Sequence, residues 1–253
     1  MKEIGFKGRL AVITGAASGM GLYATKEFVR LGAKVIMCDV NAEALAGAAA
    51  LIGPEAIPVA GDVRKYSYAE EVARVARENG GADYLIPFAG GFEARVCKSN
   101  VPFYEQPIEV IDWGIDVNLK GAVYFSRALM PQMVAKKYGV IVLVGSVTGF
   151  EGDGIGAMYG TAKSGLFNFV KGLAIAGAPH GVRAVCVTPG PVLTRPGMAG
   201  MPTLLGRAAE LPELVDVILF MCSDNASFIT GSNHVVDGGR LCMYQPVQPL
   251  KQQ

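Results

Sequence analysis

Residues 10–21 read LAVITGAASGMG and decide the fold. The run from Leu10 to Thr14 is apolar, as in a buried strand, and glycines follow it at once in a G-x-x-x-G-x-G pattern. Where a strand turns into a helix, glycines permit a tight turn and let the backbone approach a pyrophosphate, which the N–H groups of the helix N-terminus then bind. The residues expected to line this dinucleotide-binding turn are Gly15, Ser18, Gly19, Met20 and Gly21.

Outward from this turn, apolar runs alternate with helix-like stretches in the order typical of βαβ units. Strands are predicted at 10–14, 34–39, 56–60, 83–89, 140–145 and 182–188, with a last short edge strand at 233–237. Helices are predicted at 20–31, in the alanine-rich stretch that ends at Leu51, and at 66–78, 107–137 and 157–176. Because the strands are apolar on both faces, the predicted fold class is α/β, a doubly wound parallel sheet (Rossmann fold) with helices on both faces.

No linker or internal repeat divides the chain before its C-terminal end, so residues 1–239 are predicted to form a single domain. Residues 240–253 differ, because closely spaced prolines argue against helix or strand there. We expect this C-terminal tail to be frayed or to pack on a neighbouring subunit.

The composition excludes several classes of protein. Lys and Arg number 23 against 22 Asp and Glu, a net charge of +1, which excludes a surface built mainly to bind nucleic acid. Hydrophobic residues make up 51% and charged residues 18%, so the chain can bury a large core. The five cysteines form no C-x-x-C pair, and neither a signal peptide nor an apolar run of membrane-spanning length is recognisable. We expect a cytoplasmic protein with reduced cysteines, no membrane segment and no metal ion.

An acid ends the second predicted strand. Asp39 lies eighteen residues beyond Gly21, where the carboxylate of a dinucleotide-binding unit accepts hydrogen bonds from the adenosine ribose. A carboxylate there repels a 2′-phosphate, and neither Ser18 nor the Val40-Asn41 pair supplies a cation that would attract one. The pattern therefore favours NAD over NADP as the cofactor. The alternative is that Asp39 caps a helix that begins at Asn41.

Tyr159 is the one tyrosine of nine that is followed four residues later by a lysine, Lys163. In a helix this spacing places both side chains on one face, where the cation favours the phenolate and lowers the pKa of the tyrosine. Tyr159 then suits general acid/base work on an alcohol proton. Ser146, thirteen residues upstream, ends a buried strand with a hydroxyl that could donate to a substrate carbonyl oxygen. Taken alone, the Tyr–Lys pair would be a surface contact of little consequence.

Together these features resemble the short-chain dehydrogenase/reductase family, and the resemblance covers about residues 8–239. The motifs that carry it are TGAASGMG (14–21), Asp62-Val63 after the third strand, Asn118 in VNLKG, Ser146, Tyr159 with Lys163, PGPVLT (189–194) and ITGSNHVVDGG (229–239).

The resemblance implies a catalytic tetrad. Tyr159 would be the general acid/base, and Lys163 would lower its pKa and bind the nicotinamide ribose. Ser146 would orient the substrate oxygen, and Asn118 would hold a water that relays protons. Family members commonly form homo-oligomers, here a tetramer or dimer, through the helices predicted at 107–137 and 157–176.

The resemblance also implies contacts to NAD. Asp62 and Val63 would approach the adenine. In the 189–194 segment, which begins at Pro189, Val192 and Thr194 would hold the nicotinamide carboxamide.

One segment departs from the family pattern. Where the family usually carries Asn-Asn-Ala-Gly after the fourth strand, this chain has Pro87, Phe88, Ala89 and Gly90. Ala89 and Gly90 keep the small residues that let a cofactor pass close to the backbone, but the amides that usually steady the sheet are missing. We expect Asn118 to be held differently as a result.

Three loops are expected to face the substrate, at residues 91–104, 150–158 and 195–211. Their charged residues either grip a hydroxylated or charged substrate or are merely solvated; they are Glu93, Arg95, Glu151 and Asp153. The third loop is a short lid, whose methionines, Met198 and Met201, are expected to pack rather than to recognise. We expect the tail after Arg240 to help close the pocket.

The leading hypothesis is an oxidoreductase that transfers a hydride between NAD and a small or medium-sized secondary alcohol or ketone. One alternative is an NADP-dependent carbonyl or acyl-thioester reductase, which Asp39 disfavours. The other is a catalytically silent dinucleotide-binding protein, which the Pro87-Phe88 departure favours.

Overall fold

The computed structural model of the protein describes residues 2–243. Within them, seven parallel strands form one sheet in the order β3-β2-β1-β4-β5-β6-β7, which confirms the predicted α/β fold. The strands are β1 (Leu10–Thr14), β2 (Lys34–Asp39), β3 (Ala56–Ala60), β4 (Tyr84–Pro87), β5 (Gly139–Val144), β6 (Val182–Pro189) and β7 (Asn233–Val236).

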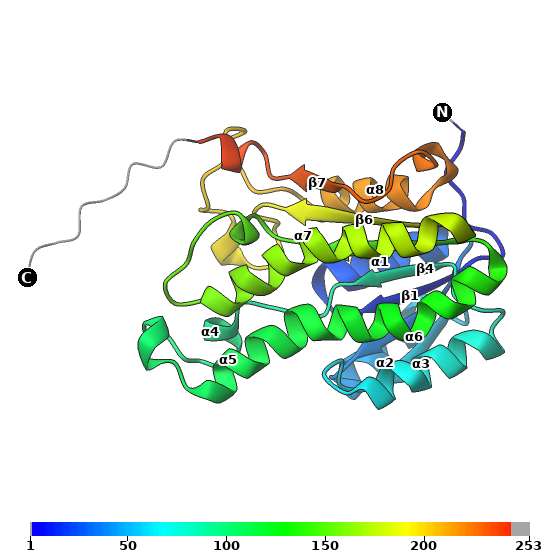
Figure 1. The fold of residues 1–253 in the computed structure, drawn as a ribbon, viewed down its shortest axis with the longest axis horizontal. Helices are drawn as coiled ribbons and strands as arrows, with labels where there is room; N and C mark the ends of the chain where they lie inside the picture. The colour runs from blue at the N-terminus through cyan, green and yellow to red at the C-terminus, as the bar shows by residue number, and fades with distance from the viewer. Residues whose placement is uncertain (1, 244–253) are drawn as a thin grey trace, which may run out of the picture.

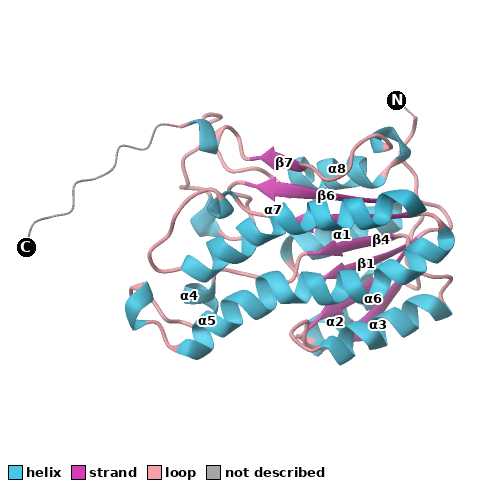
Figure 2. Ribbon diagram, viewed as in Figure 1, coloured by secondary structure: helices cyan, strands magenta, loops and turns pink. Residues whose placement is uncertain are grey.

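Helices cover both faces of the sheet (Figures 1 and 2). The core on one face takes buried side chains from α1 (Gly19–Arg30), α2 (Ala42–Ile52) and α8 (Leu211–Cys222). The core on the other face takes them from α3 (Tyr66–Glu78), α6 (Gly121–Lys136) and α7 (Ala157–Gly177). The sheet therefore separates two apolar layers, as the doubly wound arrangement requires.

The central strand β1 contributes to both layers. Ala11 and Ile13 belong to the first core, and Leu10 and Val12 belong to the second. This alternation explains why the sequence of β1 is apolar throughout.

The strand order reverses beside β1, which lies between β2 and β4. From this point the chain winds outward to β3 on one side and to β7 on the other. Loops that leave neighbouring strands in opposite directions open a crevice at the carboxyl ends of the strands. The candidate site lies in this crevice.

The helix predicted at 107–137 is divided in the structure. It consists of α5 (Ile108–Ile115), a π-helical turn at Asp116–Lys120, and α6. A π-helical turn is frequently found at functional sites, and this one carries Asn118.

Two further differences concern the strands and short helices. The fourth strand ends at Pro87, two residues earlier than predicted, because a proline has no N–H to continue the ladder. Helix α8 and the short α4 (Glu93–Val96) were not predicted. The start of α8 has a recognisable signal, since the Glu213 side chain accepts a hydrogen bond from the Glu210 N–H at 2.8 Å. Among residues 2–243, no helix combines the length and the apolar character needed to span a membrane.

Candidate active site

The glycine turn between β1 and α1 brings three backbone segments together. Gly15 has a φ of +68°, and a Cβ there would lie 2.9 Å from the backbone N of Ala89. A Cβ on Gly21 would overlap the carbonyl oxygen of Gly15. The packing of the turn itself therefore requires Gly15 and Gly21, whereas the sequence motif suggested the approach of a pyrophosphate as the reason. Gly19 instead faces the cleft, with Thr194 Cγ2 as the nearest atom, 3.8 Å from a Cβ position.

The N-terminus of α1 is suited to an anion. Its N-cap residue, Ser18, makes no capping hydrogen bond through its side chain, and the first turn contains no acidic residue. The N–H groups of the first turn and the positive end of the helix dipole thus have no side-chain partner within the first turn. The turn and the helix together fit the pyrophosphate of a dinucleotide.

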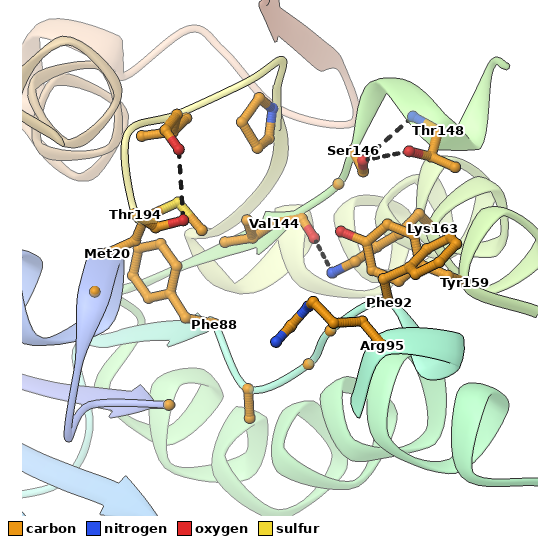
Figure 3. A pocket seen from close by; sticks show the side chains of 18 of the residues that line it. Met20, Phe88, Phe92, Arg95, Val144, Ser146, Thr148, Tyr159, Lys163 and Thr194 are labelled. Carbon is orange, nitrogen blue, oxygen red and sulfur yellow. Dashed lines mark hydrogen bonds between the residues drawn. The ribbon is translucent and has the colours of Figure 1, made fainter. Parts of the chain in front are cut away.

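A cleft of about 1330 Å³ runs along the carboxyl ends of the strands (Figure 3). Pockets for one small molecule usually measure about 300–1000 Å³, so this cleft has room for a cofactor and a substrate together. Every residue predicted to bind cofactor lines it: Gly15, Ser18, Gly19, Met20, Gly21, Asp39, Asp62, Val63, Ala89, Gly90, Tyr159, Lys163, Pro189, Val192 and Thr194. Ser146 lines it too, whereas Asn118 lies just beneath the lining.

Asp39 lies at the end of β2, on the wall of the cleft. Its Oδ2 accepts a hydrogen bond from the Ala17 N–H at 3.1 Å, and its Oδ1 accepts one from the Asn41 N–H at 3.0 Å. The cap of α2 comes from Asn41, whose Oδ1 accepts from the Ala44 N–H at 3.0 Å. Asp39 is therefore not the helix cap of the alternative reading; it joins the glycine turn to β2 with its carboxylate at the cleft.

A cation that the sequence analysis did not single out also lines the cleft. Arg64 Nη2 lies 2.7 Å from Asp62 Oδ2, and hydrogen bonds from Arg64 lower the pKa of Asp62. The expected adenine site thus contains an Asp62–Arg64 ion pair in the same cleft as the carboxylate of Asp39.

The segment that departs from the family pattern is held by Thr14, at the end of β1. The Phe88 N–H donates to the Thr14 carbonyl at 3.1 Å, and the Ala89 N–H donates to Thr14 Oγ1 at 3.0 Å. These two bonds steady the end of β4 without the amides that are missing.

Asn118 ties the π-helical turn to the loop after β4. Its Oδ1 accepts from the Gly91 N–H at 2.8 Å, and its Nδ2 donates to the carbonyls of Gly91 at 3.0 Å and Gly114 at 2.9 Å. A Cβ on Gly90 would lie 2.5 Å from Asn118 Oδ1, so only glycine fits there. Both amide hydrogens of Asn118 are occupied; any water it holds must bind Oδ1 or the backbone.

Tyr159 and Lys163 point from α7 into the cleft, and Ser146 faces them from the end of β5 (Figure 3). Lys163 is buried; its Nζ donates to the Val144 carbonyl at 2.8 Å and lies 5.6 Å from the centre of the Tyr159 ring. Burial lowers the pKa of Lys163 to about 8. The Ser146 hydroxyl donates to Thr148 Oγ1 at 3.2 Å. Ser146, Tyr159 and Lys163 thus lie together in the cleft, as the sequence predicted.

The pKa of the Tyr159 phenol is raised, chiefly by burial. The nearby Ser146 hydroxyl and the positive charges of Arg195 and Arg95 act in the opposite direction and lower that pKa. The expected net fall in the Tyr159 pKa through Lys163 is therefore not found, because burial outweighs the neighbouring groups. Among the cations, Arg195 and Arg95 lower the pKa of Tyr159 the most.

Glu93, which the sequence placed among candidate substrate contacts, is an internal cap. Its side chain is buried; Oε1 accepts from the Met158 N–H at 2.9 Å, and Oε2 accepts from the Tyr159 N–H at 3.1 Å. A carboxylate at this position satisfies the first N–H groups of α7 and complements the helix dipole. Glu93 therefore fixes the start of the helix that carries Tyr159.

Glu151 and Asp153 are also engaged within the protein. Arg240 donates from Nε to Glu151 Oε1 at 2.8 Å and from Nη2 to Oε2 at 3.0 Å. Asp153 Oδ1 accepts from the Gly156 N–H at 2.7 Å. Of the four charged residues expected in the first two loops, Arg95 is the one whose side chain has no hydrogen bond or ion pair to another residue of the 2–243 range.

The lid and the tail both reach the cleft. Met198 and Met201 line it from the third loop, as do Arg240, Leu241 and Met243 from the first part of the predicted tail. The described part of the tail thus forms part of the wall of the cleft of its own chain. Residues 244–253, and with them the predicted contact to a neighbouring subunit, lie outside the described residues.

A profile of the family described as short chain dehydrogenase matches residues 9–200. The chain belongs to the short-chain dehydrogenase/reductase family. Membership confirms the resemblance drawn from the motifs and makes the protein an oxidoreductase.

Individual short-chain dehydrogenases match over almost their whole length. The 2-dehydro-3-deoxy-L-rhamnonate dehydrogenase (NAD(+)) of Sphingomonas sp. (strain SKA58) is 32% identical over 248 residues, which cover 93% of this chain and 96% of the relative. The cis-4-hydroxycyclohexanecarboxylate dehydrogenase of Sinomonas cyclohexanicum is 33% identical over 249 residues, 92% of this chain and 97% of the relative.

A solved structure agrees with the fold. The crystal structure of the short-chain dehydrogenase/reductase SDR:Glucose/ribitol dehydrogenase from Brucella melitensis superposes with a TM-score of 0.84 at 29% identity. The match covers 94% of this chain and 98% of that one.

Proposed function

We propose that the protein is an NAD-dependent dehydrogenase that interconverts a secondary alcohol and a ketone on a small or medium-sized molecule. The observation that carries this proposal is the convergence of Ser146, Tyr159 and Lys163 in a cleft that also contains Asp39 and the N-terminus of α1. Two relatives of similar length are named as dehydrogenases, one of them with NAD(+).

NAD, when bound, accepts or returns the hydride at its nicotinamide ring. The first turn of α1 would bind the pyrophosphate and Asp39 the adenosine ribose. Asp62 and Val63 would contact the adenine, and Val192 and Thr194 the nicotinamide carboxamide. The fit rests on the uncapped helix, the size of the cleft and the Asp39 carboxylate at its wall.

Proton transfer is the proposed task of Tyr159. Oxidation of an alcohol releases the hydroxyl proton as the hydride leaves the carbon, and the phenolate accepts that proton. Ser146 would hold the substrate oxygen, and the Lys163 ammonium beside the ring would stabilise the phenolate. Because burial raises the pKa of Tyr159, alcohol oxidation should accelerate as the pH rises and the phenolate fraction grows.

Asp39 supports NAD over NADP, since its carboxylate would repel a 2′-phosphate. The one observation that favours NADP is Arg64, a cation on the same side of the cleft, but its guanidinium is paired with Asp62. The silent-protein alternative loses its main support, because Thr14 holds the Phe88-Ala89 backbone in place of the missing amides.

A screen of secondary alcohols with NAD and with NADP at alkaline pH, read by the absorbance of reduced cofactor, tests the proposal. Tyr159→Phe should lower turnover by about 10²- to 10⁴-fold while NADH binding stays within twofold. Substantial residual turnover would refute the role of Tyr159. Faster reduction of NADP than of NAD would overturn the cofactor assignment, and no reduction with any alcohol would favour a silent binding protein.

We also propose that the protein is a cytoplasmic homo-oligomer, a tetramer or dimer, assembled through the α5–α6 and α7 helices. Ile108 at the start of α5 is 67% exposed and Ile175 on α7 is 77% exposed, and a partner subunit would cover such large apolar side chains. Light scattering of the purified protein tests this; a monomer at micromolar concentration contradicts it.

A further inference from the structure

Two arginines enter the substrate end of the cleft without a partner. Arg95 extends from α4 into the cleft (Figure 3), and its Nη2 lies 3.2 Å from the position of a Cβ on Gly91. Arg195 lines the cleft from the loop after β6. In the part of the chain that the structure describes, neither guanidinium forms an ion pair or a side-chain hydrogen bond.

Arg95, Arg195 and Tyr159 line one cleft, and the charges of the two arginines act on each other and on the Tyr159 phenol. The positive charge of Arg95 lowers the pKa of Arg195, and both charges lower the pKa of Tyr159. Two neighbouring cations repel each other, and an anion bound between them would turn that repulsion into attraction. Both arginines are exposed, so an anion can reach them. Their place beside the phenol, where the substrate oxygen must lie, makes a substrate the molecule that can supply that anion.

Every other charged side chain on the cleft wall has a polar partner among residues 2–243. Arg64 is paired with Asp62, and Arg240 is paired with Glu151. Asp39 accepts two backbone hydrogen bonds at the cofactor side. Asp153 accepts a hydrogen bond from the Gly156 N–H, and Lys163 donates to the Val144 carbonyl. Arg95 and Arg195 are thus the charged side chains of the cleft wall that have no polar partner among the described residues.

Apolar side chains line the same cleft as the two arginines. Phe92 packs edge-on against the Tyr159 ring, with centroids 6.1 Å apart, and Phe150 lines the same end of the cleft. Met198 and Met201 complete the wall from the lid loop. A ligand that fits carries one anionic group on a compact carbon body.

We propose that Arg95 and Arg195 bind a carboxylate of the substrate, so that the protein oxidises hydroxy acids or reduces the corresponding oxo acids. A guanidinium matches the two oxygens of a carboxylate, and two guanidinium groups can hold both its oxygens from different sides. The carboxylate would fix the carbon chain so that the reacting hydroxyl lies at Tyr159 and Ser146. This inference rests on the proposed dehydrogenase function and specifies its substrate class.

A phosphate of the cofactor is the other source of an anion for the two arginines. The N-terminus of α1 already offers a pyrophosphate site, and it lacks any side-chain cap. An experiment can distinguish the two sources. If the anion belongs to the substrate, replacing an arginine weakens the binding of acids; if it belongs to the cofactor, the replacement weakens the binding of the dinucleotide.

The test compares acids with their uncharged amides of the same shape: acetate, butyrate, benzoate and cyclohexanecarboxylate against the four carboxamides. Binding to the NADH-loaded protein is followed by cofactor fluorescence, and inhibition is measured with the best alcohol of the screen. We expect at least one acid to bind about tenfold or more tightly than its amide. Arg95→Gln and Arg195→Gln should each reduce that preference to below about threefold, Arg95→Lys should keep part of it, and NADH affinity should stay within twofold.

Arg77→Gln is the matched control, because Arg77 is an exposed arginine at the far end of α3 and does not line the cleft. It should leave the preference for acids unchanged. The inference is overturned if no acid is preferred over its amide, or if the arginine variants lose NADH affinity as strongly as acid affinity. If no alcohol is oxidised but acids still bind through the arginines, the proposed reaction fails while the anion site stands.

Discussion

The two ends of the cleft are built in different ways. The pyrophosphate part of the cofactor end is built mainly from the backbone of one βαβ unit: the turn at Gly15, the N-terminus of α1 and the end of β2. The substrate end is made of side chains that join distant segments. Glu93 caps α7 across 65 residues of sequence, and Arg240 binds Glu151 across 89. Substitutions at the first end should change cofactor affinity, and substitutions at the second should change turnover or substrate affinity.

Lys163→Met should have the largest effect. It should lower the turnover number and raise the free energy of unfolding. Turnover should fall by about 10²-fold or more, because the ammonium beside Tyr159 is lost. The free energy of unfolding should rise by about 1–3 kcal/mol at pH 7, because methionine removes a buried charge. The cost of burying that charge is seen in the pKa of Lys163, which burial lowers from 10.5 to about 8.

The pH dependence follows from that shift. Between pH 8 and 10.5 the unfolded chain binds more protons at this lysine than the folded one, so the native protein gains stability as the pH rises through that window. The advantage of Lys163→Met should therefore shrink towards pH 10.5. Urea unfolding at pH 7 and pH 10.5 checks this, with the exposed Lys26→Met as control; a variant less stable than the native protein at pH 7 contradicts it.

Gly21→Ala tests the cofactor end. The added Cβ overlaps the carbonyl oxygen of Gly15, so the turn must shift, at a cost of about 1–3 kcal/mol. NADH affinity should fall by about tenfold to a hundredfold, as measured by fluorescence titration. Gly47→Ala, which meets no atom within 4 Å, should leave affinity unchanged. Intact NADH affinity in Gly21→Ala would show that the turn does not shape the cofactor site.

Glu93→Gln tests the substrate end. The amide keeps one acceptor but loses the charge that complements the N-terminus of α7, which should cost about 1–2 kcal/mol of stability. The turnover number should fall by about five- to thirtyfold as Tyr159 moves, while NADH affinity stays within twofold. Thermal unfolding, turnover and NADH titration measure the three quantities, with the exposed Glu109→Gln as control. A loss confined to NADH affinity would erase the distinction between the two ends.

The Glu151–Arg240 pair should give the smallest effect. Both side chains are partly buried, with 26% and 11% exposure, so the pair should contribute about 1 kcal/mol or less. A double-mutant cycle with Glu151→Gln and Arg240→Gln measures the coupling free energy of the pair. The KM of the best alcohol is determined for each variant, and the coupling should be no larger than this contribution. Additive effects of the two substitutions would mean that the pair does not shape the substrate end.

The same contrast explains what could be predicted from the sequence. The strands, the glycine turn, Asp39, Tyr159 and Lys163 belong to local patterns, and the structure places each where the pattern indicates. The roles of Glu93, Glu151 and Arg240 depend on contacts between loops far apart in the chain, which no spacing reveals. The break of the 107–137 helix was also missed, because residues 116–120, DVNLK, contain no proline or glycine that would mark it.

The direction of the Tyr159 pKa could not be predicted either. The Tyr–Lys spacing suggests a lowered pKa, but the balance depends on burial and on two arginines that come from separate loops. Solvent exposure of a phenol is a property of the folded cleft rather than of a motif.

The place of Arg240, Leu241 and Met243 in the wall of the cleft has a practical consequence for handling the protein. Substitution or removal of these three residues changes the wall of the cleft and should alter the measured KM of bulky substrates. The other end of the chain is anchored elsewhere, since the Lys2 N–H donates to Asn225 Oδ1 at 3.0 Å, in the segment after α8. A purification tag therefore belongs at the N-terminus, where Lys2 lies outside the lining of the cleft.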